Sequence, residues 1–159
     1  MATLKSLTGS GWLKDADDNF TAINAELAYT TGYHITPFVF DTAVNDATSP
    51  TPVSNKTVAA HPLAVTIPDN AIVIGGSIDV ITAITSDGSA TVAISLVAAN
   101  DLLTATAKAS LAIKAQLPLA AVISQPIKLE AAKAVTVTVG AAALTAGKIN
   151  GYIIWIEGA

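Results

Sequence analysis

The sequence predicts a mainly β fold: an antiparallel β-sandwich or jelly roll of about eight strands, preceded by a short N-terminal arm and helix. Short segments of Val, Ile, Ala, Thr and Ser, which alternate in polarity, fill the chain from Leu63 to Glu157. Turn-forming residues separate these segments. No helical pattern alternates with them, as it would in a parallel sheet, so we expect the sheets to be antiparallel.

The composition indicates a protein that associates with other chains. Of the 159 residues, 52% are hydrophobic and only 13% are charged, about half the usual share of ~25%. So few charges cannot cover a monomer in the ordinary way, and we expect apolar surface to face other subunits. The net charge of −4, with eight Lys and no Arg, argues against nucleic acid as a partner.

Composition also excludes several other classes. The absence of cysteine rules out disulfides and Cys-ligated zinc. No basic amphipathic stretch indicates a membrane surface, and no run of 18 apolar residues predicts a spanning helix. The N-terminal stretch lacks the continuous apolar region of a signal peptide, so we expect synthesis in a cytoplasm.

Residues 1–32 are expected to form an arm and an amphipathic helix that serve in attachment. Asp15 suits the N-cap, apolar residues then recur on one helical face, and Gly32 can end the helix. The spacing also fits about two and a half heptads, so the helix either packs on its own domain or docks on another chain. The apolar residues that we expect to dock are Leu4, Leu7, Trp12, Phe20, Ile23 and Leu27.

Residues 33–159 are expected to form the β-sandwich domain. Its first strand is predicted at Tyr33 to Phe40, where Pro37 suggests a sheet edge. A loop without periodicity occupies residues 41–57, and a second strand runs from Val58 to Ile67 with an internal proline, Pro62.

The third strand is long and is predicted over Ala71 to Thr85, with Gly75-Gly76 as a bulge or kink. Ser86-Asp87-Gly88 is interpreted as a hairpin turn that leads to a strand from Ser89 to Val97. Residues 98–110 are predicted to be a loop with a helical turn. The remaining strands are predicted at Leu111 to Leu117, Val122 to Leu129, Ala134 to Val139 and Lys148 to Glu157. The residues that we expect in the core include Val92, Ile94, Val137, Val139 and Ile154.

The last strand is apolar on both faces. Tyr152 and Trp155 lie on opposite faces, and Ile153, Ile154 and Ile156 accompany them. A strand of this kind is buried on both sides or covered by another subunit. We expect an oligomer interface formed by Tyr152, Ile154, Trp155 and Ile156. A sugar-binding aromatic platform is the alternative, although few planar polar residues lie near this strand.

Several segments resemble small structural proteins of tailed bacteriophages. They are LAVTIPDNAIVIGGSIDV, ITSDGSATVAISL, NDLL and VTVTVGAAALTAGKINGYIIWIEG, which lie between Leu63 and Gly158. The N-terminal DNFTAINAEL resembles the beginnings of such proteins more weakly. Those proteins decorate heads or contribute to fibres, so the resemblance implies a structural role in a virion without assigning the part of the virion.

One acidic segment approaches a calcium-binding loop. Asp15, Asp17, Asn19 and Glu26 occupy ligand positions of an EF-hand, but Phe20 stands where the loop requires Gly. Helix capping accounts for the same acids. We therefore expect no metal site.

The catalytic motifs that we sought are also incomplete. His34 and His61 are the only histidines, and both are expected to be half-buried or at an edge. No G-x-S-x-G elbow is present, and Gly75-Gly76 lacks the Lys-Ser/Thr of a phosphate-binding loop. We expect neither an enzyme nor a cofactor.

Two functional hypotheses follow. The first is a head decoration (cement) protein on the capsid surface of a tailed phage, which binds the major capsid protein of the same virion as a homo-oligomer, in the simplest case a trimer. The alternative is a receptor- or glycan-binding module of a fibre or spike that uses the loops at 41–57 and 98–110.

Overall fold

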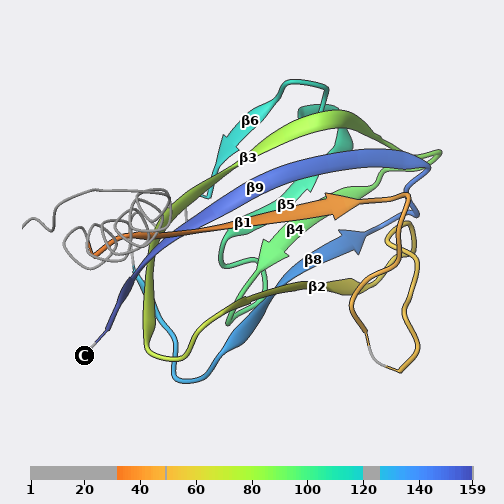
Figure 1. Cartoon of the computed structure of the whole chain (residues 1–159). Helices are drawn as coiled ribbons and strands as arrows, with labels where there is room; N and C mark the ends of the chain where they lie inside the picture. Colours follow the sequence, from red (N-terminus) through yellow and green to blue (C-terminus); the bar gives the residue numbers. More distant parts are fainter. Residues whose placement is uncertain (1–31, 49, 120–125, 159) are drawn as a thin grey trace, which may run out of the picture. The chain divides into compact units, whose positions relative to one another are not determined.

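Two antiparallel sheets form a β-sandwich in the computed structural model, which describes residues 32–48, 50–119 and 126–158 (Figure 1). One sheet contains, in spatial order, β1 (His34–Asp41), β9 (Ala146–Glu157), β3 (Ala71–Thr85) and β6 (Gln116–Pro118), and β7 (Ile127–Lys128) also pairs with β3. The other sheet contains β2 (Ala60–Ile67), β8 (Lys133–Gly140), β4 (Thr91–Ser95) and β5 (Leu103–Ala107). The predicted fold class is confirmed. The arm and helix predicted before Gly32 lie outside the described residues.

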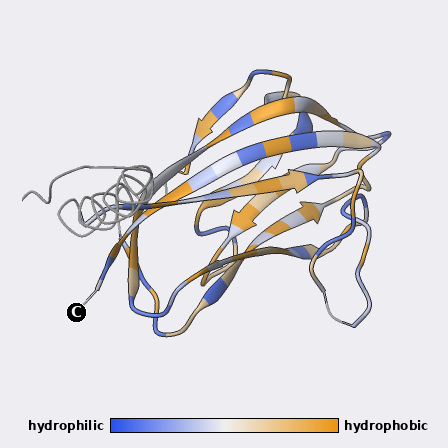
Figure 2. Cartoon of the chain, viewed as in Figure 1, coloured by the Kyte–Doolittle hydropathy of each residue, from blue (hydrophilic) through white to orange (hydrophobic). Residues whose placement is uncertain are grey.

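The core lies between the two sheets and is built from alternate residues of each strand. In β8, Val135, Val137 and Val139 are buried while Thr136 and Thr138 are only half-buried. Figure 2 shows this alternation as changes between hydrophobic and hydrophilic colours along several strands. Of the predicted core residues, Val92, Ile94, Val137 and Val139 are buried as expected.

The prediction that Ile154 is a core residue is wrong. The buried positions of β9 are Gly147, Ile149, Gly151, Ile153 and Trp155. Ile154 is half-buried on the opposite face, because successive side chains of a strand point to opposite sides of the sheet. Both faces of β9 are apolar, so the sequence alone did not show which of them is inside.

The turn at Ser86-Asp87-Gly88 connects the two sheets and is not a hairpin turn. β3 pairs with β9, whereas β4 pairs with β8 and β5, so the two strands that flank the turn do not pair with each other. The Ser86 hydroxyl donates a hydrogen bond to the carbonyl oxygen of Ala143 at 2.6 Å and accepts one from the backbone N–H of Gly88 at 3.1 Å. This turn therefore packs against the connection between β8 and β9.

Three other strand predictions needed correction. Residues 98–110 contain β5 as well as the expected helical turn, η1 (Lys108–Ser110); the strand was missed because its sequence, LTATA, has only one large apolar residue. Of the predicted strand at 111–117, only residues 116 and 117 lie in a strand, β6. Within the described part of 122–129, only β7 is a strand. β6 pairs with three residues of β3 and β7 pairs with two, so both strands are short.

The predicted bulge at Gly75-Gly76 is confirmed. The register between β3 and β9 shifts between Val73 and Gly75. A side chain at Gly76 would meet the backbone oxygen of Tyr152 and the side chain of Leu119, so only glycine allows this close approach. No helix among the described residues is long and apolar enough to cross a membrane.

Replacement of Gly151 by Ala should destabilise the protein. The ring of Phe38, which is buried, lies directly over Gly151, and a methyl group there would meet three of its carbon atoms. Overpacking of this kind costs about 1–3 kcal/mol in the free energy of unfolding. Gly75→Ala is the matched control in the neighbouring strand, because its new methyl group would lie 3.8 Å from the nearest atom, Ile154 Cδ1. Urea denaturation that showed equal stability for the two variants would contradict this account.

Candidate functional site

The outward side of the sheet that contains β9 carries an apolar surface. Ile154 pairs with Ile35 of β1, and Ile156 pairs with Ile72 of β3. Directly paired residues of antiparallel strands lie on the same face, so these side chains are neighbours. We call this surface the outer apolar face; it consists of Ile35, Pro37, Val39, Ile72, Tyr152, Ile154 and Ile156.

Much of the outer apolar face is open to solvent in the described chain. Ile35 is 66% exposed and Tyr152 is 42% exposed. Toward the other end of the sheet the face becomes polar at Asn150, and an ion pair between Lys148 Nζ and Asp41 Oδ2 follows at 3.1 Å. A contiguous apolar surface with a polar border is typical of a protein–protein contact.

Three of the four predicted interface residues lie on this face: Tyr152, Ile154 and Ile156. Trp155 instead points into its own chain, where its ring stacks on His34 at a centroid separation of 4.1 Å. The Trp155 Nε1–H also donates a hydrogen bond to Thr36 Oγ1 at 2.8 Å. Trp155 therefore stabilises the pairing of β1 with β9. The predicted docking residues between Leu4 and Leu27 lie outside the described residues.

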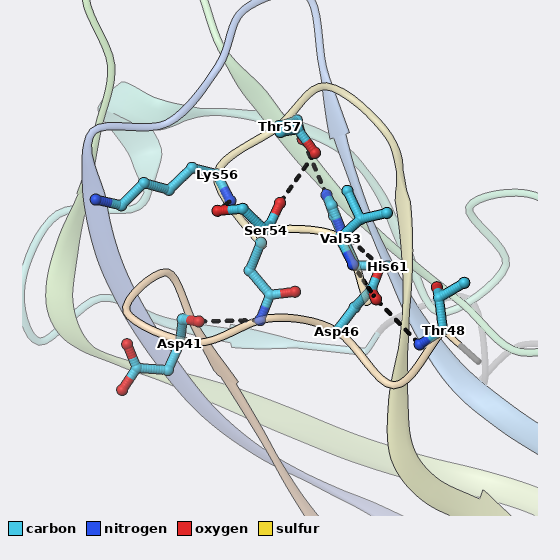
Figure 3. Close-up of polar contacts among 9 residues, drawn as sticks. Asp41, Asp46, Thr48, Val53, Ser54, Lys56, Thr57 and His61 are labelled. Carbon is cyan, nitrogen blue, oxygen red and sulfur yellow. Dashed lines mark hydrogen bonds and ion pairs between the residues drawn. The ribbon is translucent and has the colours of Figure 1, made fainter. Parts of the chain in front are cut away.

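A buried polar cluster holds the loop between β1 and β2 (Figure 3). The Asp46 carboxylate accepts hydrogen bonds from the backbone N–H groups of Val53 and Thr48, at 2.9 and 3.0 Å, and lies 3.1 Å from His61 Nδ1. His61 Nε2 lies 2.9 Å from the carbonyl oxygen of Thr57. Both ring nitrogens of His61 therefore face oxygen atoms, one of the Asp46 carboxylate and one of the Thr57 carbonyl.

This cluster corrects the expectation for His61 and explains the charge of Asp46. His61 is fully buried in β2, whereas His34 is half-buried in β1 as expected. Burial alone would raise the pKa of the Asp46 carboxyl, but the hydrogen bonds from Val53, Thr48 and His61 outweigh it and lower the pKa to about 2. Because its two ring nitrogens contact Asp46 and the carbonyl oxygen of Thr57, His61 ties the loop to β2.

The described residues show no site for a metal ion. Within 32–48, 50–119 and 126–158, no three His, Asp or Glu side chains converge. The EF-hand-like residues from Asp15 to Glu26 lie outside these ranges.

Known structures share this fold. Neither the family models nor the sequences of curated proteins give a match. The acidic stable capsid structure of Helicobacter pylori bacteriophage KHP30 contains a chain that matches with a TM-score of 0.53 and 16% identity, over 80% of this chain and 89% of that one. The cyanophage Pam1 capsid asymmetric unit matches with a TM-score of 0.56 and 14% identity, over 79% and 84%. The capsid of Ralstonia phage GP4 matches with a TM-score of 0.53 and 16% identity, over 79% and 86%.

These likenesses establish a shared fold, because identities of 14–16% carry no more than that. Each match covers most of the other chain. The fold is therefore shared over 84–89% of each of those chains and is not confined to a small part of them.

Replacement of Asp46 by Asn should lower stability at neutral pH. The folded-state pKa of about 2 lies below the unfolded value of about 3.9, so the ionised carboxylate stabilises the native state above about pH 4. That contribution is lost as the pH falls toward 2, so the difference in melting temperature between wild type and Asp46→Asn should narrow over this range. Asp87→Asn, in an exposed turn, is the control. A difference that stayed constant from pH 7 to pH 2 would show that Asp46 does not act through its charge.

Proposed function

We propose that this protein is a structural component of a tailed-phage virion and decorates the capsid surface as a cement protein. The observation that carries the proposal is the fold shared with chains of three phage capsids along most of their lengths. The sequence resemblance to phage structural proteins supports it independently. In this role the partner is the major capsid protein of the same virion, and binding to the assembled shell stabilises that shell by mass action.

The outer apolar face supports self-association. It is formed by neighbouring residues of three strands, and Ile35, which is 66% exposed, lies next to Ile154. Burial of apolar area is the main favourable contribution to association, and few charges oppose it in this chain. A homotrimer at a capsid three-fold position is the simplest assembly that matches the symmetry of a shell.

The N-terminal segment is our proposed attachment element. Its apolar residues recur at helical spacing, and a helix of this length would be marginal alone in water, so we expect the segment to gain stability by docking on another surface. Trp12 and Phe20 are the proposed anchors, because buried aromatic residues contribute much of the binding energy at interfaces.

Deletion of residues 1–14 should leave the sandwich folded and oligomeric but weaken attachment to particles. Full occupancy by the truncated protein would remove the arm from this role.

Copy number in purified virions tests the proposed function. A cement protein repeats with the shell and should be present in hundreds of copies, whereas a fibre or spike module should be present in a few or in dozens. Quantitative mass spectrometry of purified particles, with the major capsid protein as the internal reference, measures this ratio. Absence from particles would contradict a virion role, and a low copy number would favour the fibre alternative.

Replacement of Ile35 by Glu should dissociate the oligomer. Ile35 is exposed in the single chain, so the charge should not disturb the fold, but it would be buried in the proposed interface. Ile113→Glu is the matched control. Ile113 is 61% exposed, lies in a turn and is not part of the outer apolar face. Sedimentation velocity at micromolar concentration should show trimers for wild type and Ile113→Glu, and monomers for Ile35→Glu. A monomeric wild type would refute the interface.

A further inference from the structure

A cavity of about 430 Å³ opens at the edge of the sandwich, between β1 and β2. It is lined by residues 37–39 of β1, residues 63–65 of β2 and part of the loop that joins the two strands. Most of the lining is apolar. The volume lies within the range of roughly 300–1,000 Å³ that is typical of binding pockets.

The strands on both sides of the cavity are end strands of their sheets among the described residues. An end strand presents backbone N–H and C=O groups that another chain can pair with. The register between β2 and β8 is interrupted between Pro62 and Thr66, so residues 63–65 have no register partner in β8. The interruption thus falls on the part of β2 that lines the cavity, and bulges of this kind often lie beside functional sites.

Asn55 adds a buried polar atom that requires a hydrogen-bond donor. Asn55 is one of the residues that line the cavity, and it is only 1% exposed. The Asn55 Nδ2 group donates to the carbonyl oxygen of Asp41 at 2.9 Å, and this bond identifies which end of the amide is the oxygen. The Oδ1 atom is buried and has no hydrogen-bond partner among the described residues. A buried acceptor of this kind is unfavourable until a donor reaches it.

The loop that carries Asn55 is held firmly, so Oδ1 cannot easily turn to another donor. The Asp46–His61 pair secures the loop, and the backbone N–H of Ala47 donates to the carbonyl oxygen of Pro62 at 2.9 Å. Asp46 also lines the cavity, but its charge is already engaged by two N–H groups and by His61. The cavity therefore offers an apolar surface and one neutral acceptor, and it has no unpaired charge of its own to attract an ion.

We propose that this cavity binds a short, extended, uncharged segment of the major capsid protein. The segment runs along the edge of the sandwich, places apolar side chains in the cavity and donates a backbone N–H to Asn55 Oδ1. Addition of an extended segment to a free sheet edge is a recurring mode of peptide recognition, in which backbone hydrogen bonds provide affinity and pockets provide specificity. This inference rests on the proposed function, because it takes the partner from the same virion.

Ala64→Phe tests the proposal by filling the mouth of the cavity. Ala64 is an exposed residue of β2, so the larger side chain should leave the fold intact. Ala105→Phe is the matched control, because Ala105 is exposed in β5, the end strand on the opposite side of the same sheet. Binding of the full-length proteins to particles that lack them, measured by co-sedimentation, should be at least about tenfold weaker for Ala64→Phe and unchanged for Ala105→Phe.

A second measurement identifies the occupant. The chain has no cysteine, so Ala64→Cys and Ala105→Cys each provide a single attachment point for a benzophenone cross-linker. In reconstituted particles, position 64 should cross-link to an apolar segment of the major capsid protein, and position 105 should not cross-link to that segment. A cross-link from position 64 to a second copy of this chain would overturn the assignment.

The outcomes separate this inference from the proposed function. If wild-type protein does not bind particles, both are overturned. If wild type and Ala64→Phe bind equally well, or if positions 64 and 105 cross-link to the same segment, only the cavity assignment is overturned. A small apolar molecule that co-purifies with wild type but not with Ala64→Phe would also overturn it, because the cavity would then belong to a small ligand.

Discussion

The packing of Phe38 over Gly151 is the contact on which the rest of the sandwich depends. Gly151 leaves space for the ring, and the ring holds β1 against β9 in one register. A slip of one residue would turn every side chain of the strand to the other face. Because β9 also pairs with β3, this register determines that Ile153 and Trp155 lie inside and that Tyr152 and Ile154 lie outside.

Both candidate surfaces follow from that register. The outer apolar face consists of the side chains that β1, β9 and β3 turn away from the core, and Phe38 itself lines the cavity at the edge. Pro37 and Val39 belong to both surfaces, so β1 connects them. A protein that assembles through the outer face and receives an extended segment at the neighbouring edge could join several chains of a shell through a single strand.

The extent to which the sequence predicts the site differs between its parts. Tyr152, Ile154 and Ile156 were identifiable because five successive large apolar residues, at 152–156, are unusual in a strand. Ile35 and Ile72 were not, since each is ordinary in its own strand and joins the face only through pairing with β9. The Asp46–His61 pair brings together residues of a loop and a strand, and no motif spacing marks it.

The sequence by itself determined the class of fold and most strand positions, because alternation of polarity and turn chemistry are local properties of the chain. It also determined the bulge at Gly75-Gly76 and the apolar character of both faces of the last strand. Only the tertiary structure decided that the turn at residues 86–88 crosses between sheets and that Ile153 rather than Ile154 is buried. It alone placed Asn55 beside a cavity. These features depend on which distant strands pair and pack together, and that choice is made by the burial of the whole core rather than by any short segment.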